Sequence, residues 1–304
     1  MKRNTLKADS LLLLAAVIWG GGFIAQRVAA GCGSVFLFNG VRFLLGALVI
    51  LPFTRWRGTP RGPLLRWSAL AGALLFLGSF LQQAGLQFTT AGNAGFLTGL
   101  YVVFVPLFLL VAWRRRVPWL CWLAAGLAAV GVFLLSADAA LRLGRGDVLE
   151  LLGAVAWALH TIVLGLAVQR LRPLPFSVGQ YLVAGGLQLV LGLALEGPAL
   201  GRIAEWAGAV AYGGLISVGI AYTLQAVGQR HAPPADAAVI LSTEAVFAAL
   251  FGWLLLREIL AARQLAGCAL LLAAMLLAQV RRRPPRDAAG PPAAEAALHG
   301  AAGP

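Results

Sequence analysis

Long apolar runs, separated by short polar or basic connectors, dominate the hydrophobic pattern of this chain. Each run holds about 20 mostly apolar residues, enough for a helix to cross a hydrocarbon core of roughly 30 Å. Helices satisfy their own backbone hydrogen bonds inside a bilayer. The pattern predicts ten membrane-spanning helices at 9–29, 35–53, 66–88, 92–113, 117–136, 147–169, 174–195, 205–227, 233–256 and 261–280.

The composition of the 304 residues agrees with this pattern, because 60% are hydrophobic and only 12% are charged. A soluble domain carries about a quarter charged residues, so a surface that faces water all round is excluded. We therefore expect an all-α protein that lies in a lipid bilayer. Residues 281–304 are rich in Pro, Ala and Gly and lack an apolar period. They predict a disordered cytoplasmic tail.

The net charge of +13 does not indicate a nucleic-acid partner, because the basic residues lie in short clusters between apolar runs. Ten crossings place both termini on one side, and the connectors of that side carry seventeen Lys and Arg residues against six on the other. The positive-inside rule then predicts a multi-pass protein of the cytoplasmic (inner) membrane with both termini in the cytoplasm. Cys32, Cys121 and Cys268 show no metal-ligand or redox spacing, so no metal and no cofactor is expected.

Two stretches of the chain repeat each other. "ADSLLLLAAVIW" at 8–19 and "GDVLELLGAVAW" at 146–157 are identical at seven of twelve positions with a constant shift of 138. "NAGFLTGLYVVF" at 93–104 corresponds to "DAAVILSTEAVF" at 236–247, with a shift of 143. The shared acid and tryptophan of the first pair are not expected by chance in an apolar chain. The pattern indicates a duplicated half.

The duplication divides the chain into two five-helix repeats, 8–136 and 147–280. Because five is odd, the second repeat must cross the membrane upside down relative to the first. Inverted repeats build a midplane substrate site with alternating access in many transporters. The topology therefore predicts a transporter with a central cavity.

The motifs that carry this duplication resemble the EamA-type members of the drug/metabolite transporter superfamily. The resemblance rests on "AAVIWGGGFIAQRVA", "NGVRFLLGALV", "TTAGNAGFLTGLYVVFVPLF", "GDVLELLGAVAWALHTIVL" and "ADAAVILSTEAVFAALFGWLLLREILAARQLAG". It implies ten helices in two inverted five-helix units around a central cavity, and transport of a small metabolite. We expect an amino-acid-like or other amphipathic solute, and efflux as the direction.

Several polar and aromatic residues are candidates for the cavity wall. Trp19 and Trp157 lie midway along their helices, where they either stack on a ligand or pack in the core. Gln83 and Gln87 share one helix face, and Gln225 lies in the corresponding helix of the second repeat. Such amides either bind a polar substrate or bond neighbouring helices. His160 is either a ligand or proton carrier, or a core histidine with satisfied hydrogen bonds.

Arg42 and Glu244 are charged residues deep inside predicted helices. A charge at that depth must be paired, hydrated or, for the acid, protonated, and these two residues could pair with each other. The repeat places Tyr101 opposite Glu244. We expect Glu244 to face the cavity and couple transport to protonation, with a fixed ion pair or hydrogen bond as the alternative.

Catalytic arrangements are absent from the predicted membrane segments, which hold no paired carboxylates, no metal-ligand motif and no nucleophile–base pattern. A channel would show ligand rings or symmetry around a pore, and the chain offers neither. The alternative to a transporter is a polytopic membrane enzyme or receptor without transport activity.

Overall fold

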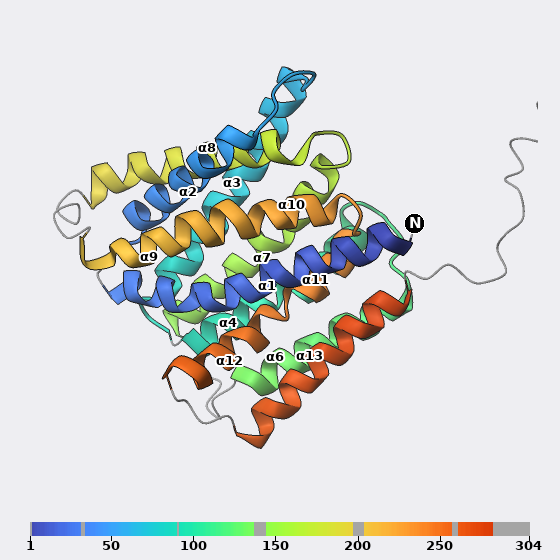
Figure 1. Cartoon of the computed structure of the whole chain (residues 1–304). Helices are drawn as coiled ribbons and strands as arrows, with labels where there is room; N and C mark the ends of the chain where they lie inside the picture. The colour runs from blue at the N-terminus through green and yellow to red at the C-terminus, as the bar shows by residue number, and fades with distance from the viewer. Residues whose placement is uncertain are drawn as a thin grey trace, which may run out of the picture.

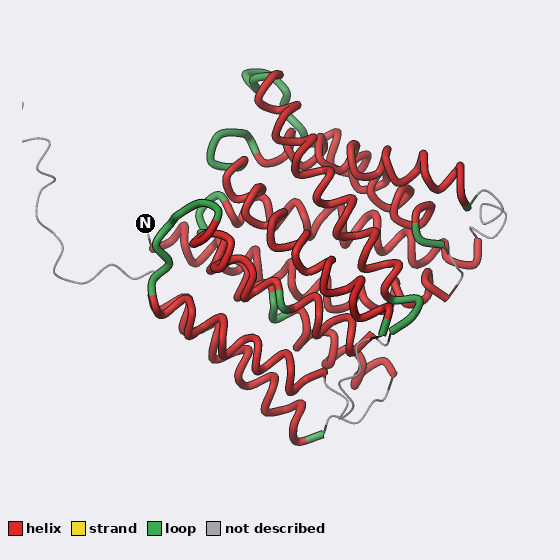
Figure 2. Tube along the Cα trace, turned by 180° about the vertical axis from the view of Figure 1, so that it is seen from behind, coloured by secondary structure: helices red, strands yellow, loops and turns green. Residues whose placement is uncertain are grey.

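A computed structural model describes residues 2–31, 34–89, 91–136, 144–196, 204–256 and 261–281, and this part of the chain consists of helices and connectors (Figure 2). The elements are α1 (Lys2–Gly31), α2 (Phe36–Ile50), η1 (Leu51–Phe53), α3 (Arg61–Gly85), α4 (Ala91–Gly99), α5 (Tyr101–Val111), α6 (Trp119–Ser136), α7 (Arg145–Ala167), α8 (Pro173–Leu195), α9 (Ala207–Ala211), η3 (Tyr212–Tyr222), α10 (Thr223–Gln229), α11 (Pro234–Leu241), α12 (Glu244–Leu256) and α13 (Ala262–Arg281).

Helix is present in every interval that the hydrophobic pattern predicted, so the chain is an all-α, multi-pass membrane protein. Seven helical stretches are long and apolar enough to cross a membrane by length and composition: Thr5–Gly31, Phe36–Phe53, Arg61–Gly85, Arg145–Ala167, Pro173–Leu195, Ala204–Gln229 and Pro234–Phe251. The apolar helices Leu97–Val111, Trp119–Leu134 and Ala262–Leu277 are shorter. The number of ten crossings stays a prediction.

The expected continuous spans 92–113 and 233–256 are each interrupted. The first consists of α4 and α5, which separate at Leu100, and the second of α11 and α12, which separate at Ser242 and Thr243. The span 205–227 is continuous, but its middle, η3, is a π-helix of 11 residues. Long π-helical stretches are rare and are often found at functional sites.

Helix packing follows a pattern that is unchanged when the first five crossings are exchanged with the last five. The helix α3 packs on α7, and η3 and α10, which form the corresponding crossing of the second half, pack on α1. The helices α4 and α5 pack on α7, just as α11 and α12 pack on α1. The contact of α3 with α8 corresponds to that of η3 with α2, and two further large contacts join equivalent helices, α2 with α8 and α6 with α13 (Figure 1).

The close contact of α1 with α12 depends on a glycine. A Cβ atom on Gly20 would lie 2.6 Å from Cβ of Phe247 and 2.9 Å from the backbone oxygen of Glu244. Only glycine allows the two backbones to approach so closely, as is common between membrane helices. This contact holds the start of α12 against the middle of α1.

The start of α2 is held by an acid from the end of α8. The carboxylate of Glu196 accepts hydrogen bonds from the backbone N–H groups of Val35, Phe36 and Leu37 at 2.9–3.1 Å. It thereby satisfies donors that the first turn of a helix leaves without partners.

The two ends of the described chain, the start of α1 and the end of α13, lie at the same end of the bundle (Figures 1 and 2). The predicted tail, 281–304, lies outside the described residues apart from Arg281, which ends α13.

Candidate functional site

A cavity lies between the two interrupted helices and encloses about 560 Å³ of empty space, open solvent included. Because that space includes solvent, the room for a bound solute is smaller, which favours a small molecule. Its wall combines aromatic, amide, hydroxyl and charged side chains from both halves of the chain. They are Trp19, Phe23, Gln26, Arg42, Gln82, Thr98, Tyr101, Trp157, His160, Thr161, Ser217, Tyr222, Gln225, Leu241 and Glu244.

The break between α11 and α12 has a local cause. The side-chain hydroxyl of Ser242 donates to the backbone oxygen of Val239 at 2.8 Å, and that of Thr243 to Ile240 at 2.6 Å. These bonds occupy carbonyl groups that a regular helix would use, and hydroxyl side chains commonly compete with the helix in this way. The acid Glu244 is the first residue after the break. We expected Glu244 to lie at the centre of a continuous helix. Instead it begins α12.

The break between α4 and α5 has a different local structure at the equivalent place. The N–H of Leu100 donates to Leu97 at 3.2 Å and that of Val103 to Leu100 at 2.9 Å, so the helix tightens to a three-residue step here. Further on, Pro106 lacks an N–H and cannot restore a regular ladder. The first residue of α5 is Tyr101, the repeat partner of Glu244. At membrane depth, irregular backbone is tolerated where it is buried or lines a cavity.

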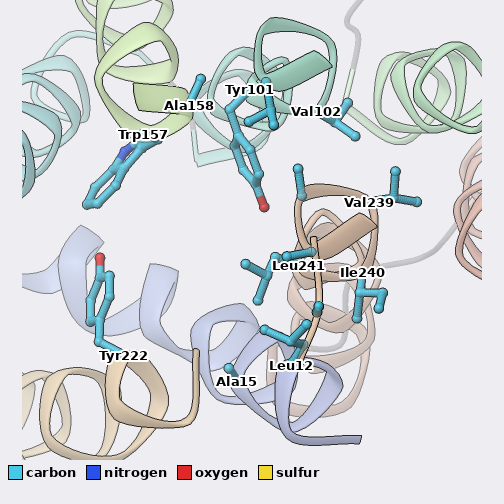
Figure 3. Close-up of a cluster of buried hydrophobic side chains, with 14 of the residues drawn as sticks. Leu12, Ala15, Tyr101, Val102, Trp157, Ala158, Tyr222, Val239, Ile240 and Leu241 are labelled. Carbon is cyan, nitrogen blue, oxygen red and sulfur yellow. The ribbon is translucent and has the colours of Figure 1, made fainter. Parts of the chain in front are cut away.

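Aromatic rings from three helices face one another across this cavity. The ring of Tyr222 lies 4.6 Å from that of Trp19 and 6.1 Å from that of Trp157, centroid to centroid. Figure 3 shows Trp157, Tyr101 and Tyr222 extending into the same space. The two repeated tryptophans therefore line one cavity, in distances typical of aromatic contacts.

The two tryptophans differ in their hydrogen bonds. The indole N–H of Trp157, which is buried, donates to Oε1 of Gln82 at 2.9 Å. That of Trp19, which is half-buried, donates to the backbone oxygen of Ser217 at 3.3 Å. The stronger polar anchor is on the α7 side, where Gln82 also donates to Gln26 at 3.0 Å.

The candidate amides divide into three situations. Gln225 lines the cavity, and its Oε1 has no hydrogen-bond partner. Gln83 is fully buried, but it donates to the backbone oxygen of Gln26 and bonds α3 to α1 instead of lining the cavity. The expectation that Gln87 turns inward is wrong: α3 ends at Gly85, so Gln87 lies in the following turn and is exposed.

The charged pair that we considered is not formed. Arg42 is 3% exposed, and its guanidinium carbon lies 5.1 Å from the ring centres of both Phe38 and Phe43. Its Nε has no hydrogen-bond partner. Within the described residues, Glu244 makes no hydrogen bond and no ion pair. The reason is geometric: the guanidinium is held by aromatic faces of its own helix, which leaves cation and acid as separate groups of one cavity wall.

His160 lines the cavity and is also hydrogen-bonded. Its Nε2 lies 2.9 Å from Oε1 of Gln180, and its ring is perpendicular to those of Trp157 and Tyr222. This geometry is compatible with both interpretations of His160, as a core histidine and as a ligand or proton carrier, because one ring nitrogen is hydrogen-bonded while the side chain lines the cavity. Within the described residues, no three His, Cys, Asp or Glu side chains lie together in a way that could hold a metal ion.

Sequence reasoning did not single out several residues of this region, among them Gln26, Gln82, Tyr222 and Glu150. Two had a usable signal. Gln26 follows Trp19 by seven residues, and Glu150 precedes Trp157 by seven, so each shares a helix face with its tryptophan. The acid Glu150 lies in the second turn of α7 and is fully buried.

Comparison with known proteins gives a consistent result. The chain matches the sequence model of the EamA-like transporter family twice, at residues 6–137 and 144–279. It is 30% identical over 280 residues to an "Uncharacterized transporter" of Archaeoglobus fulgidus, covering 91% of this chain and 87% of that protein. It is 27% identical over 264 residues to the "Uncharacterized inner membrane transporter YedA" of Escherichia coli, covering 82% and 83%.

One solved crystal structure shares the fold. It superimposes with a TM-score of 0.75 at 19% sequence identity and covers 90% of this chain and 96% of the other.

Proposed function

The chain belongs to the EamA-like transporter family, and on that premise we propose that it is a secondary transporter that exports a small amphipathic, amino-acid-like metabolite by alternating access. The observation that carries the proposal is a cavity whose wall combines aromatic rings with a cation, Arg42, and an acid, Glu244, which form no ion pair with each other or with any other residue that the structure describes. Family membership favours transport over the alternative, a polytopic membrane enzyme or receptor.

The proposed architecture is ten crossings in two inverted repeats, 8–136 and 147–280, with both termini in the cytoplasm. Two observations support it: the family model matches each half separately, and helix contacts occur in matched pairs between the halves. The inner membrane is proposed as the location, in line with the name of the E. coli relative.

The chemistry of the wall supports a solute with three parts. A guanidinium with a free donor at Arg42 suits a carboxylate or another anionic group. A carboxylate at Glu244 suits an ammonium group, and its place in the first turn of α12 is electrostatically favourable for a negative charge. The rings of Trp19, Trp157 and Tyr222 suit an apolar side chain.

Proton coupling through Glu244 is the second part of the proposal. The acid has no fixed partner and stands where an interrupted helix meets the cavity. Such a group can exchange a proton as the cavity opens to each side of the membrane, which is a common use of intramembrane acids. Against the alternative, an acid that merely fixes α12 in place, we note that Glu244 makes no hydrogen bond or ion pair within the described residues.

The test is a flux measurement with the purified full-length chain in liposomes. Candidate solutes found by thermal-shift screening of a metabolite library are loaded with a radiolabel, and their chemical identity is checked after passage. Transport predicts movement without conversion, faster than in protein-free liposomes and sensitive to Gln225→Leu on the cavity wall. Conversion of the solute, or binding without movement, would support the membrane enzyme or the receptor instead.

A further inference from the structure

A second acidic site lies behind the cavity wall, where α3, α4 and α7 meet. The carboxyl group of Glu150, in the second turn of α7, is fully buried. The hydroxyl of Thr98 from α4 donates to its Oε2 at 3.0 Å. Because Thr98 itself lines the cavity, the acid is one hydrogen bond away from the space in which the solute is proposed to bind.

The room for this carboxyl group exists because α3 has a glycine at the contact. A Cβ atom on Gly85 would lie 2.7 Å from Oε1 of Glu150. A Cβ on Gly146 would lie 2.8 Å from the backbone oxygen of Gly85, so the first turn of α7 is in direct contact with the last turn of α3. The acid therefore sits at a tight helix junction closed to solvent.

The charged neighbours of Glu150 do not neutralise it. On α7 itself, Asp147 accepts from the N–H of Gly144 at 2.8 Å and from the hydroxyl of Thr89. From α1, Arg27 donates to the backbone oxygen of Thr89 at 3.0 Å. From α3, Gly85 contacts the carboxyl group, and from α4, Thr98 does. Its Oε1 has no hydrogen-bond partner.

A carboxylate in this position would be a buried charge with a single hydroxyl donor. Such a charge is costly unless it takes up a proton or gains water. Gly144 and Arg145, at the start of α7, are exposed, so water would enter from this end of the helix if the junction opened. Since Arg27 lies in the last turns of α1, this junction is at the end of the bundle opposite the N-terminus.

We propose that Glu150 is a second proton-binding site of the protein, and that its protonated form closes the junction of α7 with α3 and α4 over the cavity. One proton adds to the carboxylate when the junction closes, and it leaves when water enters between the helices. The inference rests on the proposed function, because closing the junction matters only if a solute passes through the cavity. In this proposal, Glu150 binds a proton at the end of the bundle where α7 begins, and Glu244 binds a proton at the centre of the cavity.

Infrared spectroscopy of the full-length protein in lipid tests the site without a substrate. Protonated carboxylic acids absorb in a separate band, and we expect one such component of the pH difference spectrum to vanish in Glu150→Gln while remaining in Glu244→Gln. In Thr98→Val, which removes the hydroxyl donor to Oε2, the frequency of this component should shift. The matched control Thr161→Val, another threonine of the cavity wall, should leave it in place.

Amide hydrogen exchange tests the closure. Once rates are corrected for the intrinsic pH dependence of amide exchange, protection at residues 85–89 and 144–150 of the wild type should fall as pH rises past the titration of the band, and in Glu150→Gln it should stay high at every pH. A band unchanged by Glu150→Gln, or exchange equally pH-dependent in that variant, would overturn the inference. If flux fails in every assay but the band titrates, the transport proposal fails and the proton site stands.

Discussion

The two interrupted helices occupy equivalent places in the two halves of the molecule, yet they present different chemistry. In the second half the acid stands on the broken helix itself, as Glu244, and the adjoining helix α1 approaches through Gly20. In the first half the broken helix presents Tyr101, and the acid stands on the adjoining helix α7, as Glu150, bonded to Thr98. The two halves therefore share the arrangement of their helices around the site, but they carry the acidic residue on different helices.

From this comparison we infer that the halves have separate tasks in one cavity. The proposed alternating access requires each half to move as a unit, and a symmetric frame allows this. Under that proposal, the asymmetric groups determine what each opening of the cavity recognises. The four predictions below test where that asymmetry has consequences.

The largest effect should come from removing the acid of the second half. We expect Glu244→Gln to lower transport driven by a proton gradient at least about tenfold, while solute exchange at equal pH on both sides continues. The matched variant Tyr101→Phe should have the smaller effect on gradient-driven flux. Gradient-driven transport that is unchanged in Glu244→Gln would end the coupling proposal.

Substitutions of the two repeated tryptophans should have similar effects on solute binding but different effects on stability. Either Trp19→Ala or Trp157→Ala should weaken solute affinity about tenfold, because a stacking face is lost. Only Trp157→Ala should also lower the free energy of unfolding strongly, by about 3–5 kcal/mol, since it empties a buried site and leaves Gln82 without its donor. Binding titrations and denaturant unfolding in detergent measure the two quantities. Equal loss of stability in both variants would contradict the difference between the halves.

The equivalent positions Gly20 and Ala158 should differ in how a change of one methyl group affects the free energy of unfolding. Gly20→Ala places a Cβ within 3 Å of the backbone of α12, and we expect a loss of about 1–3 kcal/mol in the free energy of unfolding. The equivalent residue of the second repeat is Ala158, which is buried and already carries a Cβ. Ala158→Gly should cost about 1 kcal/mol from helix propensity. Thermal unfolding of both variants checks the order.

Much of the fold could be predicted because the hydrophobic pattern of the helices is strong. The repeated Trp19 and Trp157 line one cavity in the structure, and a duplication constrains both positions together. The helix breaks could not be predicted in the same way. Residues 92–113 form one mostly apolar run, and the three-residue step at Leu100 that interrupts the helix depends on local hydrogen bonds.

The amide residues show why helix phase limits site prediction. Gln82 and Gln83 are neighbours, and periodicity alone does not say which one faces the cavity until the partner helices are placed. Gln87 was expected on the same face, although Gly85 before it is a residue that often follows the end of a helix. A buried Glu150 was missed because helix ends are usually solvated, and this one is covered by α3.

The smallest effect should come from the hydroxyls that interrupt the second-half helix. The equivalent positions of the first half are Gly99 and Leu100, which have no side-chain hydroxyl, so the same break is built without these bonds. Removing both bonds in a Ser242→Ala, Thr243→Val variant should lower the free energy of unfolding by about 1–2 kcal/mol, at about 1 kcal/mol a bond. Alanine also favours a regular helix, so amide exchange at residues 242–246 should slow as the break heals. The control Thr161→Val lies in the regular part of α7. It should change the free energy of unfolding by no more than about 0.5 kcal/mol and should leave amide exchange around residue 161 unchanged. If exchange at the break quickens instead, the hydroxyls stabilise the interruption without causing it, and the difference between the two halves lies in the backbone alone.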